Sequence, residues 1–148
     1  DINNATNIST IKNNITEDSY WSDEFIVLKN STVGSLSTGT VMILANIAAG
    51  DSATTTVTAS DPKIIGMLEE TTSSGIAGRV RIGGKTVNLK VNGTTDINIG
   101  DLITTFTVAG IGAKASSGQI AFAIALESYT GNDSNGVIDA IIINPRPF

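Results

Sequence analysis

The fold is decided by residues 79–91, which read Arg-Val-Arg-Ile-Gly-Gly-Lys-Thr-Val-Asn-Leu-Lys-Val. On both sides of the two glycines, apolar and polar residues alternate, as they do in a β-strand with one buried face. A glycine pair between two such runs is typical of a two-residue hairpin turn, because glycine readily adopts the positive φ angles that the turn needs. This stretch therefore predicts a β-hairpin that turns at Gly83-Gly84 and has one wet face.

Short apolar or alternating runs recur through the rest of the chain, separated by turn residues at intervals of about 8–12 residues. They lie at residues 25–28, 41–45, 54–59, 63–68, 102–106, 120–126 and 137–143. This spacing is typical of a barrel or a sandwich. No linker-like stretch divides residues 21–148. We therefore expect an all-β fold, a single compact β-barrel or β-sandwich preceded by an N-terminal arm.

Two strands near the C-terminus are the most apolar of the chain. In residues 120–126, large side chains alternate with Ala121, Ala123 and Ala125. Strand alternation then predicts that the large residues enter the core and that the alanines form a flat face, open to close approach by another subunit. Residues 137–143 are apolar on both faces apart from Asp139, which predicts a central strand or one buried at an interface.

Residues 1–20 differ from the rest, because they contain many asparagines, no glycine and only isolated aliphatic residues. A segment of this kind cannot form a core of its own. The spacing of its last three isoleucines suits a short amphipathic helix, and an extended arm suits the sequence equally well. We expect it to dock on the domain or on a neighbouring copy, where it adds a strand to a sheet and its isoleucines fill pockets. The isoleucines are Ile2, Ile8, Ile11 and Ile15.

Composition argues against several classes of function. The chain has 148 residues, a formal net charge of −5 and no basic stripe, so nucleic acid is not an expected partner. It has no apolar run long enough to span a membrane as a helix. It contains neither histidine nor cysteine, which removes the commonest general base and the usual zinc ligands. We expect no enzymatic activity and no cofactor.

The carboxylates offer few candidate sites. Glu69 and Glu70 are adjacent in an expected strand, so we expect their side chains to point to opposite faces. Asp139 is expected to pair with a basic residue or to face solvent. The loop from Gly131 to Gly136 is a weak match to a calcium loop, in which Asp133 and Asn135 would supply oxygen ligands. A plain turn at Asn135-Gly136 is the alternative.

Two features of the sequence predict a secreted protein. The first residue is Asp rather than Met, which indicates removal of a leader. Asn-x-Ser/Thr sequons, the acceptors of N-glycosylation, are about twice as frequent as chance predicts. They begin at Asn4, Asn7, Asn14, Asn30, Asn92 and Asn132.

Residues 39–143 resemble a β-module of tailed-phage virions. The segments that carry the resemblance are Gly39–Ile43, Asp61–Gly66, Ala77–Val80, Gly100–Thr105, Ala113–Ala115 and Ile124–Ser128, in this order, before an apolar final strand. The module is similar to head-decoration, head-fibre and tail-fibre-associated domains. The resemblance implies a compact barrel or β-tulip-like unit, commonly oligomeric and displayed on a particle or fibre.

These observations predict a structural subunit that assembles with copies of itself into an extracellular filament, a tube or a virion surface. The first alternative is a capsid-decoration or head-fibre protein that binds a viral shell. The second is a carbohydrate-binding adhesin domain, for which Tyr20, Trp21 and Tyr129 are the candidate aromatic platforms.

Overall fold

The computed structural model describes residues 24–48 and 50–148, and the regular secondary structure in this part of the chain is entirely β. The expected arm at residues 1–20, with Ile2, Ile8, Ile11 and Ile15, lies outside the described residues. The strands are β1 (Glu24–Asn30), β2 (Val41–Leu44), β3 (Ser52–Thr54), β4 (Ile64–Leu68), β5 (Ala77–Val91), β6 (Leu102–Thr105), β7 (Gly112–Lys114), β8 (Ile120–Ala125) and β9 (Gly136–Pro147).

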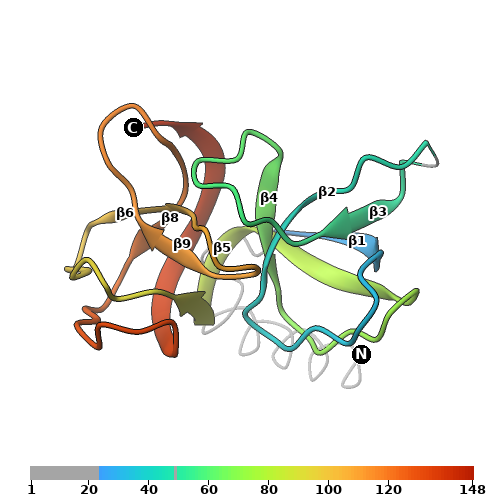
Figure 1. The fold of residues 1–148 in the computed structure, drawn as a ribbon, viewed down its shortest axis with the longest axis horizontal. Coiled ribbons are helices and arrows are strands. Elements are labelled where there is room, and N and C mark those ends of the chain that lie inside the picture. The colour runs from blue at the N-terminus through green and yellow to red at the C-terminus, as the bar shows by residue number, and fades with distance from the viewer. Residues whose placement is uncertain (1–23, 49) are drawn as a thin grey trace, which may run out of the picture.

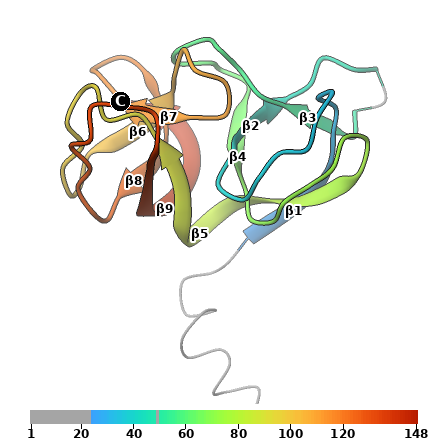
Figure 2. The ribbon, with the colours of Figure 1, turned by 60° about the horizontal axis from the view of Figure 1, so that its bottom comes forward.

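The strands close into two rings that share β5. In the first ring, the strands follow one another as β1, β3, β2, β4 and the first half of β5, and β5 returns to pair with β1. In the second ring, the order is the second half of β5, then β7, β6, β8 and β9, and β9 returns to pair with β5. Figure 1 and Figure 2 show the two lobes side by side, with β5 passing from one into the other.

The second ring repeats the first. Each has one parallel pair, β1 with β3 or β5 with β7, and its remaining pairs are antiparallel. The loops also correspond: the backbone N–H of Gly39 donates to Leu68 in the first ring, and that of Gly100 donates to Ala125 in the second. Isolated bridges occupy matching places, Leu36 with Thr72 and Ile97 with Tyr129. The described chain is therefore two copies of one five-stranded unit.

The predicted hairpin at Gly83-Gly84 is wrong. The chain does not reverse there, because β5 continues through both glycines. Residues up to Gly83 pair with β1, and residues from Gly84 onward pair with β9. Gly84 has a φ of 90°, which an L-residue adopts only with strain. Glycine inside a strand often marks a sharp bend, and here it redirects β5 from one barrel to the other.

The core joins the two barrels. The interior of the first barrel holds a small cluster made of Leu28, Met42, Ala53, Leu68 and Val80. The larger cluster fills the second barrel and also includes Val41, Ile43, Ile64 and Met67 from β2 and β4. One face of the β2–β4 pair therefore packs against the second barrel. The expectation of an all-β barrel is confirmed, with two closed rings in place of one.

Candidate functional site

Each strand in the described part of the chain has a neighbouring strand on both sides. The pairing of β1 with β3 is short, however: it involves Lys29 and Asn30, so Glu24–Leu28 are paired only with β5. Free edges are the usual template for the addition of a strand from another chain, and closed barrels remove them. Within residues 24–48 and 50–148, the unpaired side of Glu24–Leu28 is therefore a short edge at which an added strand could pair.

The alanine face of β8 is covered by the chain itself, whereas the sequence predicted it to be open to a second subunit. Ala121, Ala123 and Ala125 are fully buried, and so is Phe122 between them. The two even-numbered isoleucines of the strand, Ile120 and Ile124, are only partly buried. Simple alternation fails because the pairing of β8 with β9 shifts register between Ala121 and Ala123. The three alanines serve the interior of the folded chain.

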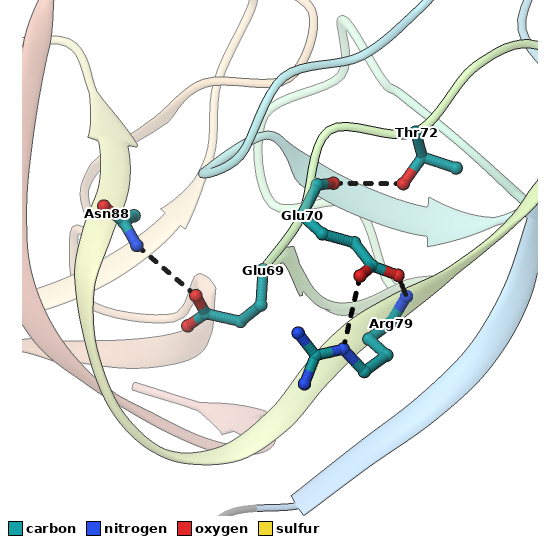
Figure 3. A network of polar contacts seen from close by, with 5 residues as sticks. All are labelled: Glu69, Glu70, Thr72, Arg79 and Asn88. Atoms are coloured by element: carbon teal, nitrogen blue, oxygen red, sulfur yellow. Dashed lines mark hydrogen bonds and ion pairs between the residues drawn. The ribbon is translucent and has the colours of Figure 1, made fainter. Parts of the chain in front are cut away.

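A cluster of charged groups covers the outer surface of the first barrel where β4 leads into the following loop. Arg81 Nε donates to Glu69 Oε1 at 2.6 Å, and the two side chains are about nine-tenths buried. Arg79 donates to Glu70 through both its backbone N–H and its Nε, at 3.0 and 3.4 Å (Figure 3). Both guanidinium groups lie over the ring of Phe25 on β1.

The two glutamates therefore share one region, contrary to the expectation that they point to opposite faces. They follow β4, outside the regular strand, and their partners Arg79 and Arg81 are two residues apart on β5. Asn88, further along β5, also donates to Glu69 at 3.4 Å (Figure 3). Each carboxylate is engaged by a cation on the neighbouring strand. The cluster holds the end of β4 against β5.

The Glu69–Arg81 pair gives a prediction on stability. Replacing Glu69 by Gln removes the charge from a buried, hydrogen-bonded pair, and we expect it to lower the free energy of unfolding by about 1–2 kcal/mol. Glu70→Gln is the matched control, because its partner Arg79 is about half exposed; its effect should stay within about 0.5 kcal/mol. Urea denaturation of the two variants measures the difference, and equal effects would contradict the account.

Tyr129 and Asp133 form the polar contact of the loop before β9. The Tyr129 hydroxyl and the Asn135 backbone N–H both donate to Asp133 Oδ1. The hydrogen bond to Asp133 raises the pKa of Tyr129, and the same bond, followed by that from Asn135, lowers the pKa of Asp133. The ring of Tyr129 is close-packed against glycines, because a Cβ placed on Gly93, Gly131 or Gly136 would overlap it.

This packing bears on two predictions from the sequence. The ring of Tyr129 packs against the backbone of three glycines and is partly buried, and its role as a platform for a sugar stays a prediction; Tyr20 and Trp21 lie outside the described residues. The Asp133 carboxylate already accepts two hydrogen bonds within its own loop. No group of three or more His, Cys, Asp or Glu side chains suited to a metal occurs in the described part of the chain. Calcium binding by Asp133 and Asn135 stays a prediction.

The Tyr129–Asp133 contact predicts how stability depends on pH. Asp133 has a lowered pKa in the folded state, so its stabilisation is present above the unfolded value of about 4 and is lost as the pH falls through the folded pKa. Tyr129 has a raised pKa, so its stabilisation is present below about pH 10 and is lost as the pH rises through the folded pKa.

Thermal melts of the unmodified chain and of Tyr129→Phe over a range of pH test this. The two melting temperatures should differ most between about pH 5 and 9, and the difference should shrink towards both extremes. A difference that stays constant from about pH 7 down to about pH 2 would show that the contact contributes nothing.

The described sequons differ in access. Asn30 and Asn92 are buried. The side-chain amide of Asn30 donates to the carbonyl oxygens of Gly34 and Thr72, and that of Asn92 donates to the Ser134 hydroxyl. Each side-chain oxygen also accepts the backbone N–H two residues later, so both asparagines hold loops in place. Asn132 is exposed. Asn4, Asn7 and Asn14 lie outside the described residues.

An apolar cavity of about 870 Å³ opens at the mouth of the first barrel. Its walls come from β1, β4, the bend in β5 and the C-terminal half of β9. Most of the side chains that line it are aliphatic, and Glu24 and Asn144 are its polar members. Barrel mouths are frequent places for binding apolar groups. Of the candidate surfaces in the described chain, this one combines concavity with apolar lining.

No helix of the described chain has the length and apolar character needed to cross a membrane. No protein-family model and no curated protein matches the chain in sequence. Among solved structures, the N base of the head fiber protein gp8.5 of bacteriophage phi29 has a similar fold, with a TM-score of 0.54. The two folds match over most of their length. The similarity covers 81% of this chain and 93% of the phage chain, at 12% sequence identity. At this identity, the similarity shows the fold alone.

Proposed function

We propose that this chain is a structural, non-enzymatic module of a virion surface, of the head-fibre-base kind, which contacts both a shell and copies of itself. The observation that carries the proposal is the extent of the similarity to the phi29 head-fiber base, which includes almost the whole of that chain. The resemblance of residues 39–143 to phage virion modules, drawn from short sequence segments, agrees with the proposal.

The chemistry of the chain agrees with a structural role. It has no histidine and no cysteine, so the commonest general base and the thiol nucleophile are missing from the sequence. Among the described carboxylates, those of Glu69, Glu70 and Asp101 are paired with cations. Glu127 accepts the backbone N–H of Asp139. Groups used in this way hold strands and loops together.

The second candidate is a subunit of an extracellular filament that polymerises without a shell. The feature that favours it is the N-terminal segment, whose isolated isoleucines need an apolar partner. Both candidates require contacts between copies of the chain. They differ in whether a viral particle is also needed.

Immunogold electron microscopy separates the two candidates. Antibody raised against the purified chain is applied to the culture from which the chain derives, after induction of any resident phage. Gold on phage heads is the result we expect, and it would support the virion module. Gold on filaments, with filaments formed by the purified chain alone, would support the second candidate. Gold on neither, with a purified chain that stays dispersed, would reject both.

A further inference from the structure

The two barrels differ at one equivalent place. The backbone hydrogen bond from Gly39 to Leu68 in the first barrel corresponds to that from Gly100 to Ala125 in the second. When β4 and β8 are aligned on these bonds, Ile65 is the counterpart of Phe122. Phe122 is fully buried, and its Cζ lies 3.5 Å from where a Cβ on Gly112 of β7 would be. It therefore spans the second barrel from β8 to β7. Ile65 is smaller and only partly buried, and it lines the open cavity.

The mouth of the first barrel is thus an apolar space that its own strands leave unfilled. Ile26, Ile65 and Ile82 lie on three different strands around it, and Ile143 of β9 adds a fourth wall. Ile26 is 42% exposed, which is high for a large aliphatic side chain beside a barrel interior. Covering such a surface with apolar side chains is favourable, by roughly 25 cal/mol for each Å² removed from water.

The chain itself contains a segment suited to this space. The N-terminal segment, residues 1–23, is bonded directly to Glu24, which lines the cavity, so it is attached at the rim. Fully extended, a segment of this length would reach as far as about 75 Å, enough to meet another copy. Its aliphatic residues stand alone among polar ones, as in segments that insert single side chains into pockets. The side of β1 that has no strand partner, at Glu24–Leu28, borders the same cavity, so a docked segment can pair with this edge while its side chains enter the cavity.

We propose that the mouth of the first barrel receives the N-terminal segment of a neighbouring copy, with isoleucines among Ile2, Ile8, Ile11 and Ile15 entering the cavity. The inference rests on the proposed function, which needs contacts between copies. A segment makes the same contacts whether it fills the mouth on its own copy or on a neighbour. Exchange between copies is therefore a low-cost route to an assembly.

Disulfide trapping tests the proposal cleanly, because the chain has no cysteine of its own. Three donors, Ile8→Cys, Ile11→Cys and Ile15→Cys, are each mixed with an acceptor, Ile65→Cys, that carries a tag of different size. The mixtures are oxidised mildly and run on a non-reducing gel. Ile26→Cys is a second acceptor, in case Ile65→Cys alters the barrel. Ile99→Cys, on an exposed isoleucine of the second barrel, is the matched control acceptor.

We expect at least one donor to form a covalent heterodimer with Ile65→Cys or Ile26→Cys at least tenfold faster than with Ile99→Cys. Equal rates for all acceptors would overturn the proposal. So would a double variant, Ile11→Cys with Ile65→Cys, that closes only within single chains, since the segment would then fill its own copy. Heterodimers without gold on phage heads would keep the mouth contact and reject the virion role, so the two failures are distinguishable.

Discussion

Replacement of Phe122 by alanine is expected to lower the free energy of unfolding by about 3–5 kcal/mol, the usual cost of truncating a buried aromatic side chain. Phe122 is fully buried and spans the second barrel to β7, so its loss leaves a cavity between strands that are closed on themselves. A closed ring cannot collapse freely around a void, because each strand is held by two neighbours. For a domain of this size, the melting temperature should fall by roughly 10 °C.

Ile65→Ala is the matched control in the first barrel. It truncates the side chain at the equivalent place, but Ile65 already borders an open mouth. We expect a loss of about 1–2 kcal/mol, because little new void is created. Chemical denaturation of both variants measures the contrast. If Ile65→Ala costs as much as Phe122→Ala at a concentration where the chain is monomeric, the mouth is filled by the same chain, or the two barrels are not equivalent.

Replacement of Gly39 by alanine is expected to cost about 3 kcal/mol or more, the sum of backbone strain and a steric overlap. Gly39 has a φ of 96°, and a Cβ there would lie 1.9 Å from the backbone oxygen of Asn88 on β5. Gly39 also donates to Leu68 and accepts from Lys90, so it ties the first barrel to the second half of the shared strand. Moving it away from β5 would break both bonds.

Gly100→Ala separates the two causes. Gly100 occupies the equivalent place in the second barrel with a φ of 91°, but a Cβ there would meet nothing within 4 Å. It should cost about 1–2 kcal/mol, from strain alone. Denaturation midpoints give the loss of stability of each variant. The loss for Gly39→Ala minus the loss for Gly100→Ala is the cost of the steric overlap with β5. Variants that cost the same would show that Gly39 does not approach β5 closely.

Local patterns in the sequence predicted most strands and the fold class, but not how the strands are connected. Two details were wrong: residues 54–59 lie mostly outside β3, and β7 was not predicted. The alternation in residues 79–91 is real, and the structure places these residues in a strand. The glycine pair was ambiguous, because a hairpin turn and a bend within one long strand use the same residue. The choice between them depends on β1 and β9, which lie far from the glycines along the chain in opposite directions.

The candidate assembly surface was predicted less well. The alternation of large residues with alanine on β8 suggested an open alanine face, but a register shift near Ala121 and the packing of the first barrel bury that face. The repeat was not apparent from the sequence, because corresponding residues, such as Ile65 and Phe122, differ in identity and in size. The cavity mouth could not be found from sequence, since its lining comes from strands that are distant along the chain.

Sedimentation velocity of the purified full chain over micromolar to millimolar concentration tests the central claim most directly. A chain that works by joining copies of itself should show species heavier than the single chain of 15.3 kDa. The share of these species should grow with concentration, as mass action requires. A single species with the mass of one chain at every concentration would contradict the account.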